Sequence, residues 1–135
     1  MSHSRRNPET LLESLADFES LVEVGIGRRS DIAAALVARS ANVTATDVHD
    51  RSVPDGVGFV RDDIVDPNLP IYEGVEAIYA QNLPPELHRP ALDVAREVDA
   101  AFLFTTLGGD QPAVPVERVT IDSGTLYVAR SSESR

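Results

Sequence analysis

The sequence predicts an α/β protein with a Rossmann-like three-layer fold, a mostly parallel sheet and a C-terminal β-hairpin. Three observations support this fold class. Short apolar runs alternate with amphipathic segments as far as residue 106, and a Gly-x-Gly turn at Gly25 and Gly27 directly follows the first of these runs. After residue 106 the alternation stops, and two β-rich segments flank one turn. We therefore expect parallel strands in the order 3-2-1-4-5, with the hairpin at the far edge beside strand five.

The first half of the chain predicts two helices and two strands. Asn7 and Pro8 suit an N-cap and a first helical turn, so they predict the start of a helix over residues 7–19. The elements that follow are a strand over 20–24, a helix from Ser30 or Asp31 to about Ser40, and a strand over 42–47. A strand, a helix and a strand within about 30 residues form a βαβ unit.

The second half predicts three more parallel strands, a helix and the hairpin. The run from Ala100 to Thr106 is almost continuously apolar, as expected of a central strand covered on both faces. The helix before it begins near Pro85, which places His88 in the first turn at an exposed or capping position. The expected elements are strands over 57–60, 75–80 and 100–106, a helix over about 84–98, and hairpin strands over 114–121 and 125–128.

Length and composition limit the class of protein. The 135 residues suffice for one domain, so we expect a single Rossmann-like domain over 1–135 with flexible ends at 1–6 and 131–135. The absence of cysteine excludes disulfides, thiolate metal sites and cysteine nucleophiles. No apolar run approaches the roughly 20 residues that a membrane-spanning helix needs, and the N-terminus lacks a signal peptide's apolar region. We expect a cytoplasmic protein without membrane contact.

The charge of the chain is strongly negative. There are 22 acidic residues and 12 basic ones, all arginine, for a net charge of −10. Such a surface repels phosphate backbones and argues against extensive nucleic-acid contact. Excess acid without lysine is also typical of adaptation to molar salt, which screens the repulsion and predicts a halophilic archaeal source. The alternative is a bias toward arginine codons in a GC-rich genome.

Candidate ligand-binding residues follow four of the predicted strands. The Gly25-x-Gly27 turn presents backbone amides at the start of a helix, where a nucleotide-type ligand can bind. Asp47 lies 20 residues beyond Gly27 at an expected exposed strand end, where a carboxylate can accept both ribose hydroxyls. After strand three, an acid can meet an adenine amino group and an apolar side chain can cover its ring. The remaining candidates, after strands three and four, are Asp62, Asp63, Ile64, Gln81 and Asn82.

The segment from Val22 to Gly27 resembles motif I of class I S-adenosylmethionine-dependent methyltransferases. The resemblance implies that Glu23 and the two glycines hold the cofactor, that Asp47 binds its ribose, and that residues 62–64 contact its adenine. Residues 81–85 resemble the motif IV region. Over roughly 8–130 the chain also resembles a family of short archaeal Rossmann-like proteins whose name supplies no activity, with matching segments at Pro84-Pro85-Glu86-Leu87 and Leu107-Gly108-Gly109-Asp110.

The sequence departs from the methyltransferase pattern in two places. Arg29 stands where a third glycine is usual, and Arg28 and Arg29 put two cations at a helix N-terminus, which is unfavourable unless an anion binds or the side chains are solvated. The candidates for such an anion are a ligand carboxylate, a phosphate and Glu23. In the alternative interpretation, both arginines lie at the surface and pair with nearby acids. The segment between strand five and the hairpin has only about eight residues, whereas methyltransferases usually have a helix there.

Two functional hypotheses remain open. The first is a pared-down S-adenosylmethionine-dependent methyltransferase that works mainly by positioning its substrates, with no catalytic residue assigned. The second is a non-catalytic binding or regulatory module for S-adenosylmethionine, NAD or a related nucleotide; Asp47 would serve NAD equally, but no second domain is expected to hold its substrate. No metal is expected, because Asp47, His49 and Asp50 share one loop without a further ligand. Either hypothesis leaves a homo-oligomer or a partner protein open.

Overall fold

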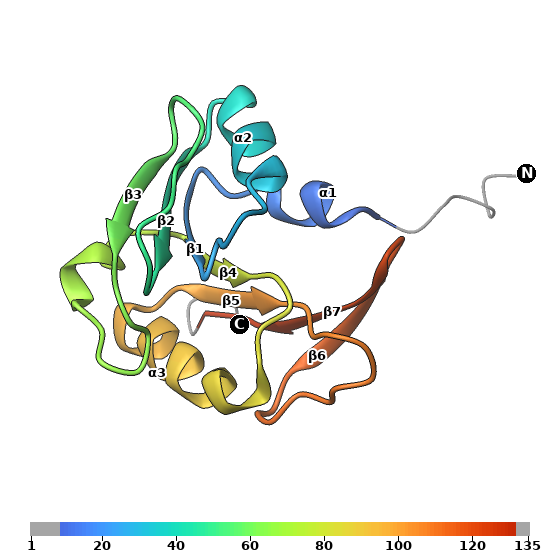
Figure 1. Cartoon of the computed structure of the whole chain (residues 1–135). Helices are drawn as coiled ribbons and strands as arrows, with labels where there is room; N and C mark the ends of the chain where they lie inside the picture. The colour runs from blue at the N-terminus through green and yellow to red at the C-terminus, as the bar shows by residue number, and fades with distance from the viewer. Residues whose placement is uncertain (1–8, 132–135) are drawn as a thin grey trace, which may run out of the picture.

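The computed structural model describes residues 9–131 and contains one seven-stranded sheet with helices on both faces (Figure 1). The sheet order is β3-β2-β1-β4-β5-β7-β6. The first five strands are parallel in the predicted order, and the antiparallel hairpin lies beside β5, which confirms the predicted fold class. The strands are β1 (Ser20–Val24), β2 (Asn42–Asp47), β3 (Gly58–Arg61), β4 (Ala77–Ala80), β5 (Ala101–Phe104), β6 (Glu117–Ile121) and β7 (Gly124–Ala129).

The helices form the two outer layers. Figure 1 shows α1 and α2 on one face of the sheet and α3 on the other. β5 supplies both cores by strand alternation, because Ala101 and Leu103 face α1 and α2 whereas Phe102 and Phe104 face α3. The helical segments are α1 (Leu11–Leu15), α2 (Asp31–Ala38), α3 (His88–Val98) and the 3₁₀ turns η2 (Leu69–Ile71) and η3 (Pro85–Leu87).

The topology creates a switch point at the carboxyl end of β1. This strand pairs in parallel with β2 on one side and β4 on the other, so the connections leaving β1 and β4 turn in different directions. The register places Val24 beside Thr46 and Ala80, so the three strands end at nearly the same level. Ligands of open α/β sheets bind in the crevice outside such a point, and the candidate residues lie there.

The predicted start of the N-terminal helix lies too early in the sequence. It begins at Leu11 and ends at Leu15 instead of spanning 7–19. Thr10 is its N-cap, because the Thr10 hydroxyl accepts from the Glu13 amide at 3.0 Å while the Glu13 carboxylate accepts from the Thr10 amide at 2.9 Å. Glu9 instead forms a parallel bridge with Ile121 of β6. Asn7 and Pro8, with the segment 1–6, lie outside the described residues, as do residues 132–135.

The loop between β5 and β6 is long and contains no helix within the described chain. Its twelve residues, 105–116, exceed the connection of about eight residues expected from the sequence, because β5 already ends at Phe104 and β6 begins only at Glu117. The predicted starts of β3, β4 and β5 were one or two residues too early, and that of β6 was three residues too early, since these strands begin at Gly58, Ala77, Ala101 and Glu117. Across residues 9–131, no helix is long and apolar enough to cross a membrane.

Candidate functional site

The glycine turn after β1 is fixed to the end of β2 by backbone hydrogen bonds. The amides of Gly25 and Ile26 both donate to the Thr46 carbonyl, at 2.9 and 3.1 Å. Gly25 and Gly27 have φ angles of +69° and +57°, which L-residues with side chains rarely adopt. A Cβ atom added at Gly25 would meet no other atom within 4 Å, so the backbone conformation requires this glycine and its outer face is open.

Asp47 joins the glycine turn to the loop that leaves β2. Its Oδ2 accepts from the Gly27 amide at 2.8 Å, and its Oδ1 accepts from the His49 amide at 3.0 Å. The Arg51 guanidinium lies 3.4 Å from Oδ2. Burial alone would raise the pKa of Asp47, but these two amides and Arg51 outweigh burial and lower it.

The predicted exposed position of Asp47 was wrong. Asp47 retains only 8% of its surface, because the turn folds back over the strand end. The sequence spacing gave its position on the strand but not this contact, which joins residues 20 positions apart. Its carboxylate keeps capacity for a ligand, since Oδ1 accepts one bond from protein and an ionised carboxylate oxygen can accept two.

Glu23 is a buried acid on β1 with neutral partners. It is 1% exposed, and its carboxyl group accepts from the Tyr79 hydroxyl at 2.7 Å and from the Gln81 amide at 3.0 Å. Burial raises the pKa of Glu23 to about 7 although both hydrogen bonds act in the opposite direction. No cationic side chain contacts it within residues 9–131. Glu23 is therefore poised to accept either a proton or a ligand's cation.

The two acids after β3 have different roles in the structure. Asp62 accepts from the Tyr72 hydroxyl at 2.6 Å and from the Asn68 amide at 3.0 Å, so it holds the following loop in place. Asp63 is exposed, and its Oδ1 accepts from the Val65 amide at 3.0 Å. Ile64 is only 5% exposed within the core on the α3 face, and therefore offers little surface to a ligand ring.

A shallow cavity of about 520 Å³ lies beside these acids. Its lining consists of Val48, Arg61, Asp62 and Asp63. Val48 is 48% exposed and directly follows Asp47, and the Arg61 guanidinium donates to the Val48 carbonyl at 2.9 Å. An exposed apolar side chain beside two carboxylates suits a flat heterocycle that carries amino groups. Val48 was not among the residues predicted to bind a ligand, although it directly follows Asp47 in the sequence.

Asn82 and Arg29 connect the end of β4 to the glycine turn. The Asn82 amide donates to the Thr105 hydroxyl at 2.9 Å, and its backbone is left-handed, with φ of +54°. When the carboxamide is oriented to satisfy its neighbours, Oδ1 accepts from the Arg29 guanidinium, with Nη2 at 3.1 Å, and Nδ2 donates to the Thr106 carbonyl at 3.3 Å. Neither Arg28 nor Arg29 has a carboxylate partner in the described part of the chain, so the alternative in which both pair with nearby acids is not seen there.

His88 was predicted to be exposed or capping, and this was wrong. It is 0% exposed, with Nε2 donating to the Leu83 carbonyl at 2.8 Å and Nδ1 accepting from the Ala113 amide at 3.0 Å. Its ring lies 4.4 Å from that of Phe104. His88 thus connects the segment after β4 to the loop after β5. Helical spacing could have shown this, because His88 shares a face with the buried Leu92.

The sequence matches a known protein family over almost its whole length. The uncharacterised protein family UPF0146 matches residues 7–132. The chain belongs to this family. A UPF0146 protein of Halobacterium salinarum is 52% identical over 126 residues, which cover 93% of this chain and 98% of the relative. One of Archaeoglobus fulgidus is 47% identical over 90 residues, which cover 67% and 69%. The Halobacterium relative supports the halophilic character inferred from composition.

Solved methyltransferase structures share the fold of this UPF0146 protein. The S-adenosylmethionine-dependent methyltransferase SibL gives a TM-score of 0.63 at 15% identity, covering 90% of this chain and 54% of SibL. An RNA methyltransferase from Salinibacter ruber in complex with S-adenosyl-L-homocysteine gives 0.57 at 16%, covering 87% and 85%. Methanococcus jannaschii fibrillarin, a pre-rRNA processing protein, gives 0.61 at 13%, covering 84% and 66%. These likenesses establish the Rossmann-like methyltransferase fold.

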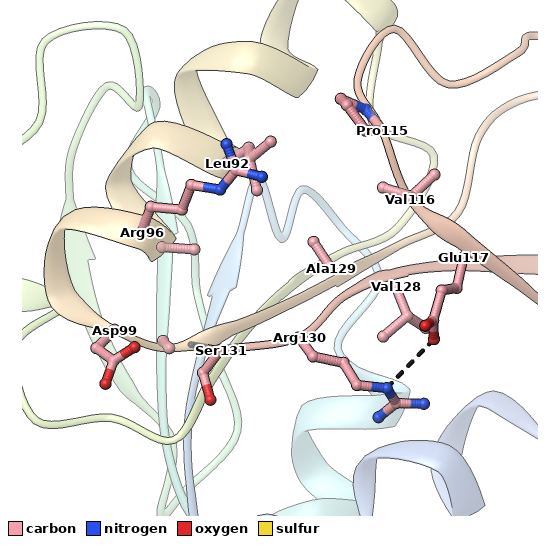
Figure 2. A pocket seen from close by; sticks show the side chains of 12 residues that line it. Leu92, Arg96, Asp99, Pro115, Val116, Glu117, Val128, Ala129, Arg130 and Ser131 are labelled. Carbon is pink, nitrogen blue, oxygen red and sulfur yellow. Dashed lines mark hydrogen bonds and ion pairs between the residues drawn. The ribbon is translucent and has the colours of Figure 1, made fainter. Parts of the chain in front are cut away.

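A larger hollow of the UPF0146 protein lies away from these residues. It measures about 870 Å³ and separates α3 from the β6–β7 hairpin (Figure 2). Figure 2 shows Leu92 and Arg96 of α3 on one side and Val116 on the other, with the ion pair between Glu117 and Arg130 at 3.2 Å. None of the predicted ligand-binding residues lines it. The candidate residues therefore lie at the strand ends and not in this hollow.

No metal-binding group was found in the described part of the UPF0146 chain. Within residues 9–131, no three or more histidine or acidic side chains gather closely enough to hold a metal ion. Asp47 and His49 contact each other through the His49 backbone amide, and His49 is exposed. This loop therefore works as a turn around the Asp47 carboxylate.

Proposed function

We propose that this UPF0146 protein binds S-adenosylmethionine at the carboxyl ends of β1, β2 and β4 and acts as a small methyltransferase. The observation that supports this most directly is the pairing of two buried acids with one glycine turn. Asp47 bonds the Gly27 amide, and Glu23 lies on the strand that leads into the same turn. Among the solved neighbours that share this fold, SibL is an S-adenosylmethionine-dependent methyltransferase, and the Salinibacter ruber RNA methyltransferase has S-adenosyl-L-homocysteine bound.

The residues present fit the three parts of this cofactor. Glu23 is buried without a cationic partner in residues 9–131, so it suits an ammonium group delivered by a ligand. Asp47 has capacity left on Oδ1 for a ribose hydroxyl. The cavity between Val48 and Asp63 suits an adenine ring and its amino group. The open outer face of Gly25 lets the ligand approach the backbone closely.

When bound, S-adenosylmethionine supplies an electrophilic methyl group on a sulfonium sulfur. The protein's task is then to align an acceptor with that methyl group and to keep both in place. Asn82, held by Thr105 and Arg29, borders the space in which an acceptor would lie. No side chain is required as a general base when the acceptor atom carries a free lone pair.

A non-catalytic binding module is the alternative, favoured by one observation. Residues 105–116 contain no helix, so the wall of the site beyond β5 is made of loop and hairpin alone. NAD remains a second ligand candidate, because Asp47 could accept from its ribose in the same way.

Calorimetry in molar KCl with S-adenosylmethionine, S-adenosyl-L-homocysteine and NAD tests the proposal. We expect one molecule of S-adenosyl-L-homocysteine to bind per chain and NAD to bind much more weakly. Asp47→Asn should reduce this affinity about tenfold or more, because a charge-assisted bond becomes a neutral one. The control is Asp50→Asn on the exposed loop nearby. Absence of binding by the wild type would contradict the proposal. Tighter binding of NAD than of S-adenosyl-L-homocysteine would show that NAD, and not S-adenosylmethionine, is the ligand.

A further inference from the structure

A second cavity adjoins the candidate site where β4 and β5 end. It measures about 560 Å³ and lies between the start of α1, the strand ends and the turn of the β6–β7 hairpin. Its volume is in the range of small-molecule sites, which extends from about 300 to 1,000 Å³. The lining is rich in hydroxyl and amide groups, from Gln81, Asn82, Thr105, Thr106, Ser123 and Thr125.

The charge of this lining differs from that of the whole protein. The chain has 22 acidic residues and a net charge of −10, yet no Asp or Glu of the described residues 9–131 lines the cavity. The charged lining residue is Arg29. Donors from hydroxyls and amides, together with one guanidinium and no carboxylate, complement a negatively charged group.

Arg29 is held at the cavity wall by Asn82. Both terminal nitrogens of the guanidinium face the single Asn82 Oδ1 atom, and Asn82 is itself fixed through Thr105 and Thr106. A guanidinium has five N–H donors in a planar fork, so one neutral oxygen leaves donors available. No carboxylate of residues 9–131 pairs with Arg29. The side chain is therefore oriented, charged and still able to bind an anion.

We propose that this cavity binds a small organic anion whose carboxylate or phosphate group is held by Arg29, and that this molecule is the methyl acceptor. The second clause rests on the proposed methyltransferase function. In the transfer, a lone pair of the acceptor atom forms the new bond to the methyl carbon, the bond from that carbon to sulfur breaks with its electron pair remaining on sulfur, and a proton on the acceptor atom passes to water. A nucleic acid is a poor occupant, because the acidic surface repels its phosphates.

NMR titration in molar KCl at constant ionic strength tests the binding. The probes are methyl phosphate and succinate, one for each anionic group, with glycerol as the neutral control. We expect one of the anions to shift the backbone amides of Asn82, Thr106 and Gly124 saturably, both in the free protein and in protein saturated with S-adenosyl-L-homocysteine. If neither anion shifts these amides, or if glycerol does so equally, the anion site is refuted.

The matched variants are Arg29→Gln and Arg28→Gln, which remove the same charge from adjacent exposed positions. Only Arg29 lines the cavity. We expect Arg29→Gln to weaken binding of the anion at least tenfold, and Arg28→Gln to change it less than twofold. Arg29→Lys, which keeps the charge but loses the planar fork, should lie between the wild type and Arg29→Gln. Equal losses in Arg28→Gln and Arg29→Gln would show a general charge effect and overturn the proposal.

Affinity for S-adenosyl-L-homocysteine separates the two parts of the proposal. We expect Arg29→Gln to leave this affinity unchanged and the anion to bind beside the cofactor product. If the variant loses both ligands, or if the cofactor product displaces the anion, Arg29 serves the cofactor's own carboxylate and the acceptor site is refuted. If the wild type binds the anion but not the cofactor product, the methyltransferase proposal and the acceptor role fail, while the anion site stands.

Discussion

Glu23 and Asp47 are buried acids on neighbouring strands, and their surroundings favour opposite charge states. Glu23 meets a tyrosine hydroxyl and a glutamine amide, and its pKa is raised to about 7. Asp47 meets two backbone amides and the Arg51 guanidinium, and its pKa is lowered despite burial. Burial opposes ionisation of both, so the partners decide the outcome. Asp47 contributes to stability as an anion, whereas ionised Glu23 costs stability until a cation arrives.

The largest expected effect is the loss of stability in Asp47→Ala. Removing the carboxylate leaves the Gly27 and His49 amides without their acceptor, and we expect the free energy of unfolding to fall by about 4 kcal/mol. At the exposed strand end that the sequence predicted for Asp47, the same change would cost little stability. Guanidinium unfolding in molar KCl measures it, with Asp50→Ala as the control. A loss below about 1 kcal/mol would show that these bonds do not fasten the turn.

Glu23→Gln should act in the opposite direction and depend on pH. The pKa of Glu23 rises from 4.5 to about 7 on folding, so the folded state holds more protons in this interval and wild-type stability falls as pH increases through it. The variant carries no such cost. Its stability relative to wild type should therefore increase by about 3 kcal/mol between pH 4 and pH 8. A pH-independent difference would mean that Glu23 titrates normally. Calorimetric melts across this range provide the measurement.

Arg51→Gln, which removes the charged partner of Asp47, should lower the free energy of unfolding less than Asp47→Ala does. The pair is partly buried, with the Arg51 side chain 25% exposed, and Arg51 is a weaker partner of Asp47 than the two amides. We expect a loss of about 1 kcal/mol near neutral pH that disappears once Asp47 is protonated. The Asp47 pKa, followed by carboxyl NMR, should increase in the variant and remain below its ordinary value. An increase above that value would make Arg51 the dominant partner.

Salt should distinguish the buried acids from the exposed ones. We expect the melting temperature of the wild type to increase up to molar KCl, because a net charge of −10 means self-repulsion that salt screens. The stability difference between Asp47→Ala and wild type should change by less than about 0.5 kcal/mol over the same series, since buried bonds to amides are little screened. A flat or falling melting temperature would contradict salt adaptation.

The parallel sheet could be predicted because its signals are local. β1 and β2 have the predicted bounds, since β-forming residues end there at Gly25 and at the polar loop after Asp47. The helix start at Leu11 was missed although Thr10 and Glu13 form a capping box that the sequence displays. Asn7 and Pro8 also suit an N-cap and a first helical turn, and the prediction followed these residues instead of Thr10 and Glu13.

The candidate site could be predicted only in part, because its contacts cross between strands. Spacing placed Glu23 and Asp47 at neighbouring strand ends, but their charge states depend on Tyr79 and on the amide of Gly27. Similarly, the contact between Arg29 and Asn82 joins two turns that no periodicity relates. Sequence patterns identify the strand to which a residue belongs; its hydrogen-bond partners emerge only when the turns fold over the sheet.

The bridge between Glu9 and Ile121 covers part of the edge strand β6, where another copy of the chain could otherwise pair. β6 is an outermost strand, and an uncovered edge strand offers its amides and carbonyls to another molecule. Like charges often keep such edges apart, but molar salt screens them. The Asp122 amide donates to the Glu9 carbonyl at 2.9 Å. Salt does not screen this bond as it screens charge repulsion, because both groups are uncharged backbone groups. Glu9 thus occupies a hydrogen-bonding group at this end of the hairpin, which is then not available to the edge of another molecule.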